Sequence, residues 1–157
     1  MITDQRTIRE RFICCHHECG HAVTALAIGI QVEHVHIHIG GGAWGETTFN
    51  EDDVYAASDL DLVTKSVAGV VAERRRYFDP DIPLSGTDKS KVDKLLKFYP
   101  ENENRHLMKR AFDRAELALE KNPGVYKSLK TCLENRQQAD RHDIRRALKF
   151  NTLIKIP

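Results

Sequence analysis

The chain has 157 residues, enough for one domain with a hydrophobic core and too few for two. Its 24 basic and 23 acidic side chains nearly cancel, which argues against a dedicated nucleic-acid or membrane-surface binder. Three of the four cysteines crowd into residues 14–19, the apolar runs are short, and no secretory signal is evident. We therefore expect a soluble, cytoplasmic protein without a membrane span.

The first predicted helix contains the motif His17-Glu18-Cys19-Gly20-His21 and runs from an N-cap at Thr3 or Asp4 to about Ile28. Histidines four residues apart project from one helical face and can bind one zinc ion. The glutamate beside the first histidine can then take a proton from a zinc-bound water. The pattern H-E-x-x-H thus indicates a catalytic zinc site.

The faces of this helix have different expected roles. At 100° per residue, Cys14 and His21 lie within about 60° of His17 and form a metal face. Gly20 weakens the helix slightly, and we expect it to let another backbone approach. The opposite side is expected to enter the core and carries Ile8, Phe12, Cys19, Val23 and Leu26.

After the helix, the apolar period changes to two and predicts a strand over Gln31–Ile39. A glycine turn at residues 40–42 leads to a second strand, Ala43–Phe49, expected to be antiparallel to the first. His34, His36 and His38 share one face of the first strand. We expect them to form a polar, solvent-facing edge, and the alternative is that these alternating histidines bind a metal ion. We expect residues 51–57 to form a loop.

The remaining chain predicts helices. Ser58 and Asp61 form a capping box for a helix ending near Phe78. Further helices are expected over residues 87–98, 102–121 and 124–135, and Asp140 with Asp143 caps a last one through residue 150. The prediction is a mainly helical α+β fold in a single domain, residues 1–157. It comprises a metal-site half (1–100), C-terminal helices (101–150) and a tail (151–157).

A catalytic zinc site usually has three protein ligands and an open position, so a third ligand is needed. The downstream carboxylates that qualify are those of Glu73, Asp79, Asp81 and Asp88. Cys14, one turn before His17, is also within reach, but its thiolate as a fourth ligand would close the site.

The segment Cys15–Val23 resembles the H-E-x-G-H-A helix of the FtsH-type ATP-dependent zinc proteases. Val35–Ile37 and Gly42–Thr47 are similar to a strand and to the A-L-G-Y-T edge strand of that family. Ala68–Glu73 resembles its G-G-R-x-A-E helix. Ser85–Asp88 resembles its T-G-x-x-x-D segment with about two residues deleted. The resemblance covers nearly the whole chain.

The resemblance implies a zincin-like peptidase domain with Zn²⁺ as its cofactor. It implies His17, His21 and Asp88 as zinc ligands and Glu18 as the general base. Glu73 is the rival third ligand and would otherwise orient a ligand histidine. Substrate would bind along Ala43, Trp44, Gly45 and Glu46, where the tryptophan and the glutamate replace the family's leucine and tyrosine.

The expected function is that of a zinc metalloendopeptidase that hydrolyses extended or unfolded polypeptides through a zinc-activated water. The sequence contains no G-x-x-x-x-G-K-[ST] motif, so we expect no ATPase activity in this chain and an ATPase partner, if any, in trans. The alternative is a non-catalytic or latent zinc-stapled interaction module that acts with a partner protein. Candidates for stabilising the oxyanion are Tyr55, Tyr99 and His16.

Overall fold

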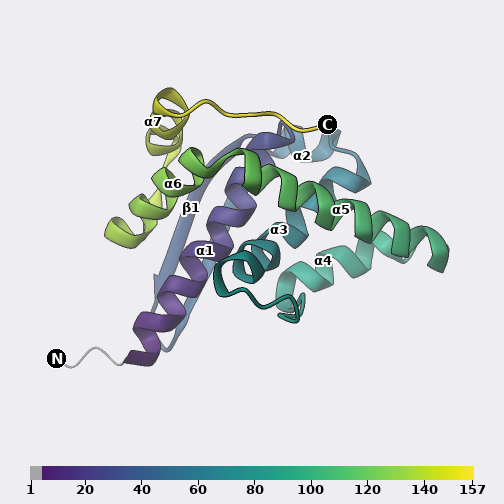
Figure 1. Ribbon diagram of the computed structural model, residues 1–157, viewed down its shortest axis with the longest axis horizontal. Coiled ribbons are helices and arrows are strands. Elements are labelled where there is room, and N and C mark those ends of the chain that lie inside the picture. The colour runs from purple at the N-terminus through teal and green to yellow at the C-terminus, as the bar shows by residue number, and fades with distance from the viewer. Residues whose placement is uncertain (1–4) are drawn as a thin grey trace.

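The structure is a computed structural model that describes residues 5–157, with side chains from residue 8 onward. Within this range the fold is mainly helical α+β with one small antiparallel sheet, as predicted (Figure 1). The predicted N-cap, Thr3 or Asp4, lies outside the described residues. The elements in chain order are α1 (Gln5–Ala27), β1 (Val32–Ile39), β2 (Ala43–Phe49), α2 (Glu51–Ala56), α3 (Asp59–Tyr77), α4 (Gly86–Leu96), α5 (Glu101–Lys121), α6 (Pro123–Arg136), β3 (Gln138–Ala139) and α7 (Arg141–Phe150).

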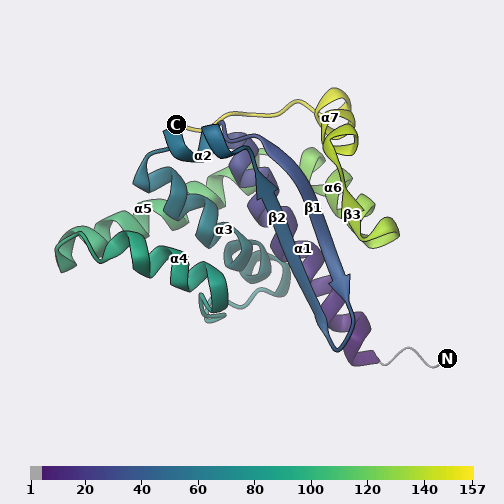
Figure 2. The same cartoon turned by 180° about the vertical axis from the view of Figure 1, so that it is seen from behind.

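Helix α1 is the central element, with α3 and the sheet packed against it on different sides (Figures 1 and 2). Between residues 15 and 27 every residue of α1 except His17 is buried. A Cβ at Gly20 would overlap the backbone oxygen of Ala68 in α3, so the glycine permits the close approach that the sequence predicted. The prediction that Ile8 and Phe12 enter the core is wrong. They are 42% and 44% exposed, because the first turns of α1 project beyond the other helices.

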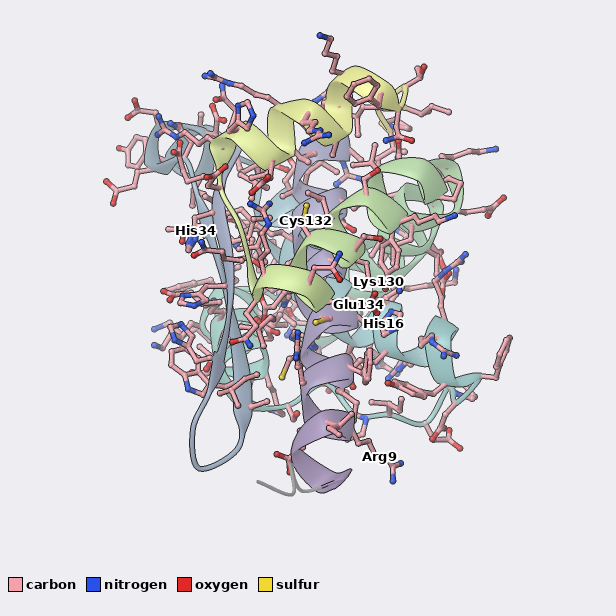
Figure 3. All side chains as sticks on the ribbon, turned by 90° about the vertical axis from the view of Figure 1, so that its left-hand side faces the viewer. Arg9, His16, His34, Lys130, Cys132 and Glu134 are labelled. Carbon is pink, nitrogen blue, oxygen red and sulfur yellow. The ribbon has the colours of Figure 1, made fainter. Side chains whose placement is uncertain are left out.

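The sheet has the strand order β2-β1-β3, and both pairings are antiparallel. Val35 and Ile37 are fully buried on the face toward α1. The three strand histidines share the other face, as predicted, but they lie on the middle strand and are half-buried rather than at a solvent-facing edge. Figure 3 shows His34 pointing away from α1. Strand β2 is an edge strand on the side of α3 and α4 (Figure 2).

The loop predicted for residues 51–57 is wrong, because Glu51–Ala56 form the helix α2. The Asn50 side chain accepts a hydrogen bond from the backbone N–H of Asp53 at 3.0 Å, an N-cap interaction. Three acidic residues in the first turn, at positions 51–53, further favour a helix start through the helix dipole.

The other predicted helices are observed. The capping box of Ser58 and Asp61 begins α3, and Phe78 ends it in the left-handed conformation at φ 52°. Asp140 and Asp143 form the capping box of α7. The sequence did not predict β3, a two-residue strand that pairs with β1. No helix within residues 5–157 is long and apolar enough to cross a lipid bilayer.

Candidate metal centre

Three side chains that the sequence singled out meet beside α1. The Nε2 atoms of His17 and His21 lie 3.0 Å from each other, and each lies 3.0 Å from Oδ2 of Asp88. Both histidines come from α1, and Asp88 comes from the first turn of α4. Among the described residues these three form the group whose ligand atoms are close enough to share a metal ion. Neither Cys14 nor the strand histidines belong to it.

The other ring nitrogen of each histidine has an acceptor of its own. Nδ1 of His17 lies 2.5 Å from Oε1 of Glu73, and Nδ1 of His21 lies 2.7 Å from the backbone oxygen of Lys65. In the neutral imidazoles these contacts place the ring proton on Nδ1 and turn the Nε2 lone pairs toward Asp88, so a metal ion or a second ring proton on Nε2 is needed between these atoms. Glu73 thus lies behind His17, on the side of the ring away from Asp88.

Helix α3 positions the imidazole of His17. A Cβ at Gly69 would overlap this ring, so α3 packs directly against the ring at a residue without a side chain. The same helix supplies Glu73 and the Lys65 carbonyl. The orientation of both histidines therefore depends on the packing of α1 against α3.

The three converging atoms fit a metal ion. Two imidazole lone pairs and a carboxylate oxygen at mutual distances of 3.0 Å are three acceptors that require a positive charge among them. A tetrahedral zinc ion with bonds of about 2.0–2.1 Å holds its ligand atoms roughly 3.4 Å apart. The observed triangle needs to widen by only a few tenths of an ångström.

The electrostatics of the cluster also favour a cation. Burial acts to lower the pKa of His17, but its hydrogen bonds to Asp88 and Glu73 outweigh burial and raise the pKa to about 10. For Asp88, burial acts to raise the pKa, but the hydrogen bonds from the two histidines hold it well below its usual range. The cluster therefore takes up positive charge, either as a proton or as a metal ion.

Glu18 lies beside this cluster and is held against β2. Its Oε2 accepts a hydrogen bond from the hydroxyl of Thr47 at 2.6 Å, and the residue is only 5% exposed. A Cβ at Gly45 would overlap the Glu18 side chain, so this strand comes close to the carboxylate only because it carries a glycine there.

A cavity of about 550 Å³ joins Glu18, the metal cluster and the edge strand. The predicted substrate positions, residues 43–46, all line it. Because β2 is an edge strand, it can pair with an extended peptide lying along the cavity. The lining residues most relevant here are Cys14, Glu18, Thr47, Phe49, Lys65, Glu73, Asp88 and Lys91.

The predicted oxyanion candidates do not line this cavity. The ring of His16 faces α6, with Nδ1 2.6 Å from the Tyr126 hydroxyl (Figure 3). The Tyr99 hydroxyl donates to Asp59, and Tyr55 is 95% exposed on α2. Sequence position alone did not reveal where these groups point.

Cys14 lines the cavity but has little thiolate character. Burial, followed by the negative charge of Glu18, raises the pKa of its thiol to about 12. In the metal-free site this raised pKa disfavours the thiolate, which is the form of cysteine that binds metal ions.

Sequence reasoning missed two lysines and a threonine in this cavity. Lys91 on α4 lies 3.9 Å from Oδ1 of Asp88, and Lys65 on α3 is 8% exposed. Burial, followed by the positive charge of Lys91, lowers the pKa of Lys65 to about 8. The clue to Lys65 was its place in the apolar stretch between Leu62 and Ala72. Thr47 gave no comparable clue.

Neither the models of known protein families nor the curated proteins include a match to this chain.

Proposed function

We propose that this chain is a zinc-dependent endopeptidase that hydrolyses extended or unfolded polypeptides. The observation that carries the proposal is the convergence of His17, His21 and Asp88 next to Glu18, in a cavity bounded by an edge strand. In this proposal the fold is a zincin-like peptidase domain, and the chain is related to the FtsH-type proteases that its motifs resemble.

His17, His21 and Asp88 would hold the metal ion. A zinc ion bound there supplies Lewis acidity, which polarises a carbonyl and lowers the pKa of a water molecule to about 7. Glu73 and the Lys65 carbonyl orient the two histidines through their Nδ1 protons. In this arrangement Asp88 is the third ligand, and Glu73 is the orienting residue.

Glu18 serves as the general base. Its carboxylate accepts the proton of the attacking water and then delivers that proton to the leaving amine. The Thr47 hydroxyl fixes one carboxylate oxygen, which leaves the other for proton transfer. The backbone of β2, at residues 43–46, aligns the substrate by strand pairing.

The proposal is tested by replacing Glu18 with glutamine, which has nearly the same shape but cannot accept the proton. We expect Glu18→Gln to bind one equivalent of zinc and to cleave casein about 10²–10⁴-fold more slowly than the wild type. The matched control is Glu116→Gln on α5, whose carboxylate pairs with Arg75 at 2.6 Å and does not line the cavity.

Equal cleavage by wild type and Glu18→Gln would place the activity elsewhere and contradict the proposal. No cleavage of casein or of a broad peptide library by the zinc-loaded wild type would favour the second reading, a latent zinc-stapled interaction module. ATP dependence of cleavage in the purified system would also contradict an endopeptidase that acts alone.

A further inference from the structure

Lys65 is a buried cation without a partner of opposite charge in direct contact. The residue is 8% exposed, and its Nζ atom lies 4.1 Å from the centre of the Phe49 ring. Within the described part of the chain, its ammonium group makes no hydrogen bond and no ion pair within 4 Å. Burying a charge without a partner of opposite sign is costly, so an anion that binds in the adjoining cavity can pair with Lys65 and reduce this cost.

The position of Lys65 places its ammonium group along the proposed substrate path. Its backbone oxygen accepts the Nδ1 hydrogen bond of His21, which fixes this turn of α3 beside the metal cluster. Its side chain lines both the 550 Å³ cavity and a second cavity of about 370 Å³. Thr47 and Phe49 of β2 also line both cavities, so a peptide paired with β2 passes Lys65 near the Phe49 end of the strand.

The carboxylates nearby are not available to Lys65. Asp88 attracts it, but this carboxylate is engaged by the two histidines at 3.0 Å and by Lys91 at 3.9 Å. A metal ion bound in the cluster would neutralise more of the negative charge of Asp88. Glu51 lines the second cavity, is exposed, and forms no ion pair with Lys65. A carboxylate partner for Lys65 is therefore sought in a ligand bound in the cavity.

We propose that Lys65 binds a carboxylate of the bound peptide and thereby selects acidic substrates. The carboxylate belongs either to an aspartate or glutamate side chain or to the C-terminus of the peptide, at one fixed place relative to the scissile bond. This inference rests on the proposed function only in taking a peptide along β2 as the ligand.

The test measures peptide binding in the zinc-loaded Glu18→Gln protein, which holds peptides without cutting them. The probes are fluorescein-labelled alanine-rich decapeptides with one glutamate moved through each position, and the same set with glutamine. Each peptide is made with a free and with an amidated C-terminus. Fluorescence anisotropy gives the affinities, and wild-type cleavage positions are read by mass spectrometry.

We expect the carboxylate to tighten binding by about tenfold to a hundredfold at one position, since hydrogen bonds between charged groups are strong. Lys65→Met and Lys65→Gln should abolish this difference. Lys109→Met, which changes an exposed lysine on α5 (75% exposed side chain), should keep it. If both Lys65 variants fail to fold, the Lys91→Gln variant is measured instead. Retention of the preference for the carboxylate peptide in this variant supports Lys65 as the binding residue, and loss of the preference overturns that assignment.

The two peptide arms identify the source of the carboxylate. A preference that survives amidation assigns it to a side chain, and one that requires the free terminus assigns it to the peptide end.

Equal affinities for all four peptide sets, or a preference that survives in a folded Lys65 variant, would overturn the proposal. Cleavage by the wild type without any preference for acidic peptides would also overturn the proposed carboxylate site, but it would agree with the proposed endopeptidase function. Lys65-dependent binding without wild-type cleavage would instead contradict the endopeptidase and support the carboxylate site.

Discussion

Oε1 of Glu73 lies 2.5 Å from Nδ1 of His17, on the opposite side of the ring from the Nε2 atom that faces Asp88. This relationship separates the two rival third ligands. A carboxylate behind a ligand histidine orients the ring and raises its basicity, whereas a carboxylate in front of Nε2 can bind the metal directly.

Removing the two carboxylates should therefore have different effects on zinc binding. We expect Glu73→Ala to weaken zinc affinity by about 10–100-fold, the usual effect of losing such an orienting partner. Asp88→Ala should abolish stoichiometric binding, because two histidines alone remain. Competition with a chromogenic chelator measures both affinities. Loss of zinc from Glu73→Ala together with its retention by Asp88→Ala would reverse the two roles.

The contact between Gly45 and Glu18 predicts a variant that loses activity while keeping the metal. A Cβ at position 45 would overlap the Glu18 carboxylate and displace it from its place beside the cluster. Misplacing a catalytic group by about 1 Å can cost about 10²-fold in rate, so Gly45→Ala should show a loss of this order in casein cleavage.

The control for that variant is Gly40→Ala, in the turn between β1 and β2. A Cβ there meets no atom within 4 Å, and the residue does not have a positive φ. Gly40→Ala should keep both zinc and activity. Full activity of Gly45→Ala would show that the position of Glu18 is not critical.

Asp61 gives the fold a predictable pH dependence away from the metal cluster. Burial acts to raise the pKa of its carboxyl, but hydrogen bonds from Ser58 and Arg114 outweigh burial and lower the pKa. A carboxylate whose pKa is lowered in the folded state adds stability above about pH 4, and this stability is lost as the pH falls through the folded-state pKa. Asp61→Asn should thus destabilise by about 1 kcal/mol at pH 7 and by much less at pH 2–3.

Urea unfolding of the metal-free protein at both pH values measures this difference. The control is Asp113→Asn, whose exposed ion pair with Lys109 should contribute little at either pH. An equal destabilisation by Asp61→Asn at pH 7 and pH 2–3 would mean that its charge is not what stabilises α3.

The sequence predicted much of the site because its main motif is local. His17, Glu18 and His21 lie within two helical turns, so helix geometry alone fixes their relative directions. Asp88 is far away in the chain and was identified by resemblance, and the structure places it with the two histidines. The capping boxes of α3 and α7 were likewise readable from residues three apart.

What the sequence did not reveal depends on packing between elements. Lys65 and Thr47 acquire their roles only when α3 and β2 close around α1. The helix α2 was missed because it has no buried residues and hence no apolar periodicity, although Asn50 and the acids after it are typical of a helix start. Ile8 has the apolar spacing of a core position, but it is 42% exposed in the folded protein.

Anomalous diffraction at the zinc edge, in crystals of the protein with one equivalent of zinc, locates the ion and so tests whether His17, His21 and Asp88 bind it. We expect one peak about 2.0–2.2 Å from Nε2 of His17, Nε2 of His21 and a carboxylate oxygen of Asp88. We also expect a water molecule in the fourth position, within hydrogen-bond reach of Glu18. Ligation by Glu73 or Cys14, or the absence of a peak at this cluster, would contradict this metal site.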